Sequence, residues 1–241
     1  MNFKDYLKIE RFPSSWCPGC GIGIVVCNTA RVFEELKLKK EDITVVSGIG
    51  CTGRAAGYFN MDTIHGLHGR AIPLAEGVKI ARPDMKVMVL SGDGDLIGIG
   101  GNHLIHACKR NTDITVICNN NHIYGMTGGQ RSPMTDKGIK TITSPYGNEE
   151  DPVNVQGIVR ANKRFFARTT TFHILHMKSV IKEAIQHKGF SFVEIVSNCV
   201  ENYGRRLGFK NAYDMLLNFK QTYKIVKDAK ELEWDEIGII K

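Results

Sequence analysis

Short apolar runs alternate with longer segments of helical length along most of the chain. Runs of strand length occupy residues 43–46, 87–90, 114–118, 165–168 and 192–196. Segments of helix length lie at residues 21–35, 73–81, 101–110 and 177–187. A strand, a helix and a further strand favour parallel pairing, because the helix carries the chain back along the sheet. The pattern therefore predicts an α/β fold with a mainly parallel, doubly wound sheet.

No internal repeat or low-complexity tract interrupts this pattern, so we expect residues 1–241 to form a single domain. The stretch 201–241 is expected to be a helical tail, with its clearest helical pattern at 212–219. Residues 127–160 are rich in Gly, Pro, Ser and Thr, and they predict a long loop. Long loops are often functional, so this one is expected to cap a ligand or to meet a partner subunit.

Composition indicates a soluble globular protein. With 42% hydrophobic residues in 241, the chain can bury a large core. It has no apolar run of the roughly 18–20 residues that a membrane span needs, and its first residues are too polar for a signal peptide, so a cytoplasmic location is expected. The formal charge of +7 is scattered and forms no basic stripe, which argues against nucleic-acid binding. A mildly basic surface would suit an acidic redox partner.

Two polar loops follow the strand candidates 87–90 and 114–118. The first reads SGDGD, with Asp93 between two glycines, and the second reads NNNHIYG, with Asn121 28 positions further on (121 − 93). Both loops leave the carboxyl ends of parallel strands, the edge at which α/β sheets bind ligands. A carboxylate, an amide, a carbonyl and glycines that admit phosphates suit a diphosphate carried by Mg²⁺. The two loops together favour such a site over a pair of simple turns.

Cysteines form the second informative pattern, since seven of them stand at positions 17, 20, 27, 51, 108, 118 and 199. An odd number without a secretory signal argues against a disulfide framework. Cys27, Cys108 and Cys118 lie in apolar runs and are expected in the core. The other four lie in loops, where four thiolates can bind zinc or an iron–sulfur cluster. One CxxC joined by two isolated cysteines favours a cluster, while zinc and unrelated thiols stay open on the residues alone.

The order of the motifs carries more information than any one of them. Along the chain come WCPGCG at 16–21, SGIGC at 47–51, LHGRA at 67–71, GDGD at 92–95, IGIGGNH at 97–103, IYGMTGGQ at 123–130 and a late Cys199. Over roughly residues 12–205 this order resembles the β subunit of 2-oxoacid:ferredoxin oxidoreductases, most closely the 2-oxoglutarate type.

The resemblance implies a fold of the thiamine-diphosphate-binding type and a set of ligands. Mg²⁺ would be held by Asp93, the Asn121 side chain and the Ile123 carbonyl, and a [4Fe–4S] cluster by Cys17, Cys20, Cys51 and Cys199. The other cofactor-binding residues would be Ile49, Gly50, Cys51, Thr52, His68, Gly92, Gly94, Asp95, Gly125, Met126 and Thr127. His68 and Arg54 are the catalytic candidates. Arg54 and Arg70 could each grip a substrate carboxylate, because a guanidinium offers a bidentate fork, although a surface or interface ion pair explains either arginine as well.

The resemblance also implies a reaction and its partners. The reaction would be the CoA-dependent oxidative decarboxylation of 2-oxoglutarate to succinyl-CoA and CO₂, with electrons passing through the cluster to ferredoxin. An α subunit carrying the pyrimidine-binding domain would supply the Glu that activates the cofactor, so the chain alone would be inactive. The chain has no CxxCxxC repeat, so further clusters would lie on other subunits, among which small γ and δ subunits are candidates.

Three alternatives stay open at this point. The first keeps the same chemistry but takes pyruvate or a branched-chain 2-oxoacid as the substrate. The second is a non-redox thiamine-diphosphate decarboxylase or carboligase, which would need Asp93 and Asn121 but not four loop cysteines. The third is a zinc-stabilised binding subunit without catalysis.

Overall fold

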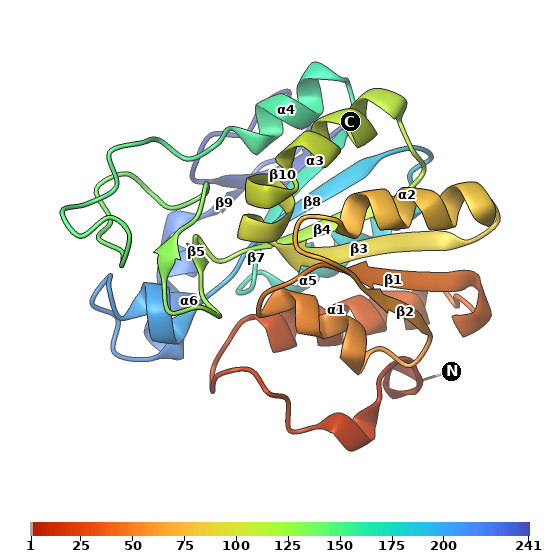
Figure 1. The fold of residues 1–241 in the computed structure, drawn as a ribbon, viewed down its shortest axis with the longest axis horizontal. Coiled ribbons are helices and arrows are strands. Elements are labelled where there is room, and N and C mark those ends of the chain that lie inside the picture. Colours follow the sequence, from red (N-terminus) through yellow and green to blue (C-terminus); the bar gives the residue numbers. More distant parts are fainter. Residues whose placement is uncertain (1) are drawn as a thin grey trace.

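A computed structural model describes residues 2–241, and within them the strands form one eight-stranded sheet and one small hairpin (Figure 1). The sheet has the order β2-β1-β3-β4-β8-β7-β10-β9. Its strands are β1 (Ile43–Ser47), β2 (Asp62–His65), β3 (Lys86–Gly92), β4 (Thr115–Asn120), β7 (Phe165–Thr170), β8 (Ser191–Val196), β9 (Lys224–Ile225) and β10 (Glu236–Ile240). The neighbours from β2 to β7 are all parallel, whereas β10 runs antiparallel to β7.

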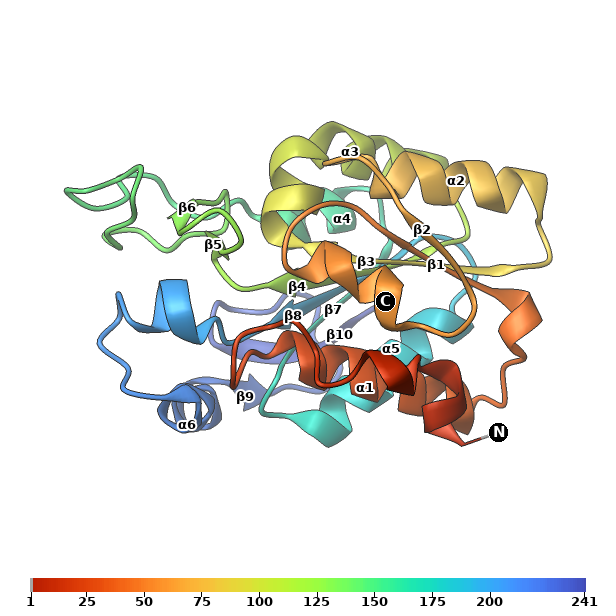
Figure 2. The same ribbon diagram turned by 60° about the horizontal axis from the view of Figure 1, so that its bottom comes forward.

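Helices cover both faces of the sheet, as Figure 2 shows. α1 (Ile22–Glu35) and α5 (Ile174–Gln186) pack on one face, while α2 (Ala71–Ala81), α3 (Gly101–Arg110) and α4 (Val155–Ala161) pack on the other. This arrangement of helices on both faces of a mainly parallel sheet is the predicted α/β fold, which is therefore confirmed.

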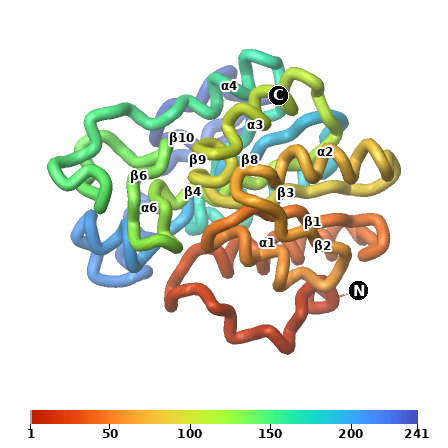
Figure 3. The backbone as a smooth tube through the Cα atoms, in the orientation of Figure 1, coloured from red at the N-terminus to blue at the C-terminus, as the bar shows by residue number. Residues whose placement is uncertain are grey.

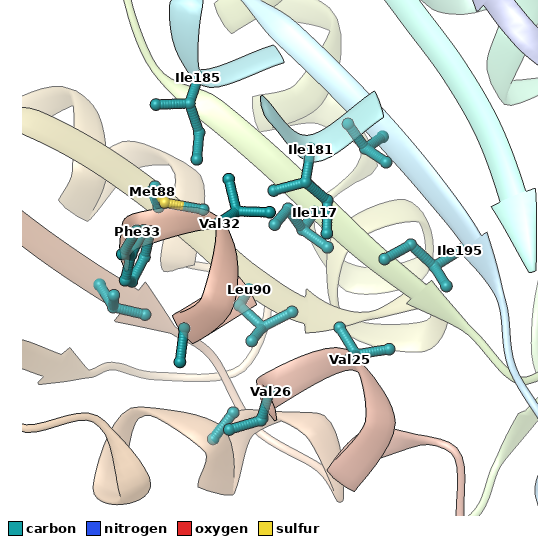
Figure 4. Close-up of a cluster of buried hydrophobic side chains, with 14 of the residues drawn as sticks. Val25, Val26, Val32, Phe33, Met88, Leu90, Ile117, Ile181, Ile185 and Ile195 are labelled. Carbon is teal, nitrogen blue, oxygen red and sulfur yellow. The ribbon is translucent and has the colours of Figure 1, made fainter. Parts of the chain in front are cut away.

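Side chains that alternate along each inner strand feed two separate hydrophobic cores. In β3, Met88 and Leu90 join the core beneath α1 and α5, whereas Val87 and Val89 join the core beneath α2 and α3. Figure 4 shows the first of these cores, in which α1 contributes Phe33 among others. Because both faces of these strands are buried, the strands read as continuous apolar runs, and that is why the sequence identifies them.

Strand register brings the polar loops to one edge of the sheet. Gly92, the last residue of β3, pairs with Asn119 of β4, and both strands run in the same direction. Asp93 and Asn121 therefore leave the sheet side by side.

All five predicted strands and all four predicted helices before residue 200 are present, with bounds that shift by a few residues. β2 and α4 were not predicted. β2 carries a single aliphatic residue, Ile64, and owes its conformation to pairing with β1. α4 has only seven residues, and its start depends on the Asn154 side chain, which accepts a hydrogen bond from the Gly157 N–H at 2.7 Å.

The tail 201–241 is not purely helical, which corrects the prediction. α6 (Ala212–Thr222) forms where a helix was expected, but β9 and β10 follow it. β10 buries Ile237 and Ile240 against the sheet. Its five residues are too few for a periodic pattern, so only the free edge of β7 determines that they form a strand.

The predicted long loop 127–160 leaves the carboxyl edge of the sheet, extends away from it and comes back to α4, as the tube in Figure 3 traces. It contains β6 (Gln130–Arg131), which pairs with β5 (Ile123–Tyr124), and most of α4. Within residues 2–241, no helix has both the length and the apolar character that crossing a membrane requires.

Candidate functional site

The loops after β1, β2, β3 and β4 meet at the carboxyl edge of the sheet and enclose a cavity of about 110 Å³. All the residues proposed for Mg²⁺ and for the cofactor line this cavity, together with one residue that the sequence did not suggest, Tyr124. The Tyr124 hydroxyl donates to the Gly94 carbonyl at 3.0 Å, and its ring meets the His68 ring edge-on. Tyr124 therefore forms a wall between the GDGD turn and His68.

Asp93 lies at the floor of the cavity and is 1% exposed. Burial raises the pKa of its carboxyl to about 6, although the Ser132 hydroxyl, which donates to Oδ2 at 2.5 Å, and the nearby His122 both oppose that rise. A divalent cation beside a buried carboxylate would stabilise its charged form. Asn121 and Ile123 line the same cavity, so a carboxylate, an amide and a carbonyl are available to a hard cation.

Asp95 has a different role from Asp93, because protein groups already donate hydrogen bonds to its carboxylate. Oδ1 accepts from the main-chain N–H of Ile49 at 3.0 Å and of Gly69 at 2.7 Å, and it lies 2.6 Å from His68 Nδ1. Oδ2 accepts from the Ser91 hydroxyl at 2.8 Å. Asp95 thus holds the loops after β1 and β2 in place. Since it accepts from His68 Nδ1, it leaves Nε2 as the free ring nitrogen of His68.

The segment 48–53 follows β1 and reads GIGCTG, which has the spacing of a dinucleotide-binding turn. It leads into η4 (Thr52–Tyr58), a 3-10 helix, rather than into the α-helix whose N-terminus would bind a pyrophosphate. A Cβ on Gly48 would clash with the Asp95 carboxylate, so this glycine serves packing against Asp95.

The four loop cysteines line a second cavity, of about 230 Å³. Its wall shares Cys51, Asn121, Gly125 and Met126 with the first cavity. Burial raises the pKa of the Cys20 thiol to about 12 and also raises the pKa values of the Cys51 and Cys199 thiols, and each is raised further by neighbouring thiols of the set. Such thiols lose their protons to a bound metal, because the metal charge stabilises the thiolate.

The four thiols surround one cavity. Among residues 2–241, no three His, Cys, Asp or Glu side chains stand close enough together to hold a single metal ion. Zinc holds its sulfur ligands at about 2.3 Å and so draws them together, whereas a [4Fe–4S] cluster binds four thiolates around a much larger core. Four thiols around one cavity are a donor set that suits such a cluster.

The chain is similar to known thiamine-dependent proteins over most of its length. Residues 48–195 match the model described as thiamine pyrophosphate enzyme, C-terminal TPP binding domain. The 2-oxoglutarate synthase subunit KorB of Methanocaldococcus jannaschii is 46% identical over 97% of this chain and 87% of its own length. KorB of Archaeoglobus fulgidus is 41% identical over 100% of this chain and 89% of its own. The chain belongs to the β-subunit family of 2-oxoacid:ferredoxin oxidoreductases.

A solved structure agrees with this assignment. The 2-oxoglutarate:ferredoxin oxidoreductase from Magnetococcus marinus, with 2-oxoglutarate, coenzyme A and succinyl-CoA bound, matches with a TM-score of 0.89 at 29% identity, over 100% of this chain and 84% of the matched chain. The predicted resemblance, the thiamine-diphosphate-binding fold and the assignment to an enzyme subunit are therefore confirmed.

In this β subunit the CxxC loop is fixed by residues that the sequence did not single out. Asn198 donates through Nδ2 to the Gly19 carbonyl at 2.5 Å and accepts from the Gly21 N–H at 3.0 Å through its main-chain carbonyl. The Trp16 indole donates to the Cys51 carbonyl at 2.8 Å. Trp16 and Asn198 directly precede the predicted cluster ligands Cys17 and Cys199, and this position is the sequence signal that could have identified them.

Gly19 also explains how the tail meets this loop. Its φ of +78° lies in the left-handed region, and a Cβ there would come within 2.5 Å of the Ala212 Cβ at the start of α6. The tail therefore packs directly on the CxxC loop.

The three cysteines predicted for the core fall where expected. Cys108 and Cys118 are fully buried, and Cys27 is partly buried and packs against the core beneath α1.

Arg54 lies on the exposed side of the site. It lines the cysteine cavity and also a third, open cavity of about 580 Å³, which Lys8, Arg11 and His65 line as well. This third cavity shares Ile49, Gly50 and Met126 with the first. A cationic opening of this kind beside the Asp93 cavity suits an anionic ligand.

The remaining candidates are less central. Arg70 lines an open groove next to Leu67 and Leu74, and its Nη1 donates to the neighbouring Gly69 carbonyl at 3.2 Å. His103 and His106 belong to α3 and do not line the cavity that holds Asp93.

Proposed function

We propose that this chain is the cofactor-binding β subunit of a CoA-dependent 2-oxoglutarate:ferredoxin oxidoreductase, which forms succinyl-CoA and CO₂. The observation that carries the proposal is the wall shared by two cavities. One cavity holds Asp93, Asn121 and Ile123, the other holds the four loop cysteines, and Cys51 belongs to both. A non-redox thiamine enzyme would have no use for four thiols in a cavity next to the cofactor.

The site residues divide by chemistry. Asp93, Asn121 and the Ile123 carbonyl would hold Mg²⁺, and Cys17, Cys20, Cys51 and Cys199 would hold a [4Fe–4S] cluster. When bound, thiamine diphosphate supplies the carbanion that attacks the keto carbon, and the cluster takes up electrons singly.

Thr52 and the glycines of the GDGD turn are the proposed contacts of the diphosphate. The Thr52 hydroxyl accepts a hydrogen bond from the Asn119 amide at 3.1 Å, so its own proton is free for an acceptor in the cavity. The glycines Gly92 and Gly94 let phosphate oxygens approach the main chain, because they carry no side chain there.

His68 and Arg54 would act on the substrate. His68 presents Nε2 with its ring held by Asp95, which suits hydrogen bonding or proton transfer near the keto group. Arg54 would hold a carboxylate through its bidentate guanidinium, helped by the positive charges of Lys8 and Arg11 in the same cavity. A dicarboxylate such as 2-oxoglutarate would gain more from this charge than a monocarboxylate would, which favours it over pyruvate and branched-chain 2-oxoacids.

An α subunit is required to complete the site. Among residues 2–241, the acids that line the first cavity are Asp93 and Asp95, and neither is free to activate a cofactor ring. That cavity is also smaller than the roughly 300 Å³ of an ordinary small-molecule pocket. Beside it lies an open, mostly apolar groove of about 820 Å³, where Leu67 is 76% exposed. A covering subunit would bury this groove, bring the missing carboxylate and enclose the cofactor.

Ferredoxin as electron acceptor, and small γ and δ subunits, belong to the same proposal, and so does a cytoplasmic location. The Magnetococcus marinus structure, which has 2-oxoglutarate, coenzyme A and succinyl-CoA bound, supports these molecules as ligands, and the family name supports ferredoxin.

The test uses the complex of this chain with its α subunit, purified without oxygen. We expect iron and acid-labile sulfide near four of each per β subunit, and reduction of a viologen that depends on CoA and proceeds faster with 2-oxoglutarate than with pyruvate. Asp93→Ala and Asn121→Ala should abolish both thiamine diphosphate binding and turnover. An iron-free complex that still binds thiamine diphosphate would show the non-redox alternative to be right, and activity unchanged in both variants would support the zinc-stabilised subunit.

A further inference from the structure

Gly125 lies where the two cavities meet. A Cβ built on it would stand 3.6 Å from Cys199 Sγ, 3.8 Å from Cys51 Sγ and 3.8 Å from Asn121 Nδ2. One main-chain position therefore faces two proposed cluster ligands and one proposed Mg²⁺ ligand. The next two residues, Met126 and Thr127, continue along the wall of the cofactor cavity.

Asn202 ties this position to the cysteine segment. Its Nδ2 donates to the Gly125 carbonyl at 2.8 Å across 77 positions of sequence. It belongs to η6 (Val200–Gly204), a single π-helical turn that begins directly after Cys199. Burial raises the pKa of the Cys199 thiol, and the main-chain N–H groups of Asn202 and Tyr203 oppose that rise. Asn202 thus lies in the turn that follows Cys199, lines the same cavity as that cysteine, and binds the cofactor loop through its side chain.

The turn η6 has a second anchor that does not involve Asn202. The Tyr203 hydroxyl donates to Asp136 Oδ2 at 2.5 Å, and the Tyr203 ring stacks on the His122 ring at 5.3 Å. Removal of the Asn202 amide should therefore leave η6 and Cys199 in place. It should release one contact only, the one to the Gly125 loop.

We propose that Asn202 is a positioning residue that holds the loop 125–127 of the cofactor cavity against the Cys199 segment. The inference rests on the proposed function. The surroundings of the cluster sulfurs tune the electronic properties of a cluster, and the Asn202 amide holds Gly125 beside the Cys51 and Cys199 sulfurs. The same amide keeps the cofactor loop from moving away from the cluster, so the two halves of the redox site act as one rigid unit.

The test compares three variants of the α–β complex. Asn202→Ala removes the side chain, and Asn202→Asp keeps its shape but removes the donor. Asn218→Ala is the matched control, because Asn218 is an exposed residue of the same tail whose side chain forms no hydrogen bond within residues 2–241. The readouts are the affinity for thiamine diphosphate with Mg²⁺, measured by titration, and the electron paramagnetic resonance spectrum of the dithionite-reduced cluster.

We expect the dissociation constant of thiamine diphosphate to rise roughly 3- to 10-fold in both Asn202 variants, as the loss of one hydrogen bond predicts. The cluster spectrum should shift in both, with iron content unchanged, and the control should match the wild type. If a variant fails to assemble its cluster, the dissociation constant of thiamine diphosphate alone tests the inference. Affinities within twofold of the wild type in both Asn202 variants would overturn the inference. A wild-type complex without iron would instead overturn the proposed function, so the two failures are distinct.

Discussion

Asp93 and Asp95 stand two positions apart, are almost fully buried, and differ in what surrounds them. Asp95 accepts from four protein groups and positions the loops around His68. Asp93 accepts from the Ser132 side chain at one oxygen and faces a cavity lined by Asn121 and Ile123. At the scale of residues, then, the Asp93 carboxylate suits a cation and the Asp95 carboxylate suits a structural role.

Ser132→Ala tests the support of Asp93. The change leaves one oxygen of a buried carboxylate without its donor, so we expect the free energy of unfolding to fall by about 1–3 kcal/mol. Urea unfolding of the α–β complex or of the refolded chain measures it. Ser179→Ala is the control, because Ser179 is exposed on α5, and it should stay within about 0.5 kcal/mol of the wild type. Equal effects of the two substitutions would contradict the role given to Ser132.

Ser132, Tyr124 and Asn202 escaped prediction for one physical reason. Their partners Asp93, Gly94 and Gly125 lie 39, 30 and 77 positions away along the chain. Serine, tyrosine and asparagine are common in loops, and nothing in their local sequence separates a positioning residue from a solvated one.

At the scale of elements, three proposed ligands occupy equivalent places. Cys51, Asp93 and Cys199 each directly precede a short helical turn, η4, η5 (Gly94–Ile99) or η6. Two of these turns are π-helical, a conformation that is often found at functional sites. The turns begin close to the carboxyl edge of the sheet, so each proposed ligand stays at the edge where the two cavities lie.

The last strand allows a test of an element that the sequence did not predict. Ile237 of β10 is fully buried, whereas Ile225 of β9 is 53% exposed. Ile237→Ala should lower the free energy of unfolding by about 2–5 kcal/mol, because it leaves a cavity at the edge of the core. Ile225→Ala should change it by no more than about 0.5 kcal/mol. Thermal and urea unfolding would detect the difference, and similar values for both would argue that β10 is not part of the folded sheet.

At the scale of the whole molecule, a buried ion pair joins two central strands. Glu194 of β8 and Arg168 of β7 are register partners, with Oε2 and Nε 2.8 Å apart. Burial raises the pKa of Glu194, but the Arg168 charge and the Asn120 amide outweigh burial and hold that pKa below its usual value. Because the pKa is lowered in the folded state, the pair stabilises the fold above the ordinary Glu pKa of about 4.3.

The stabilisation from this pair should be lost as the pH falls through the lower, folded-state pKa. We expect Glu194→Gln to lower the free energy of unfolding at pH 7 by about 3–5 kcal/mol, because it leaves the Arg168 charge buried without its partner. The difference in free energy of unfolding between wild type and variant should become smaller below about pH 4.3. Urea unfolding at a series of pH values from 7 to 3.5 checks this, and a gap that stays constant throughout would refute it.

The sequence by itself determined the parallel α/β sheet, the family and the set of candidate ligands. It could do so because strands buried on both faces read as continuous apolar runs, and because Asp93, Asn121 and the CxxC lie in loops of rare composition. Only the tertiary structure decided which of these groups share a wall, that β10 extends the sheet, and that Asn202 contacts Gly125. Those facts depend on contacts between distant segments, which packing and strand register fix and no local pattern encodes.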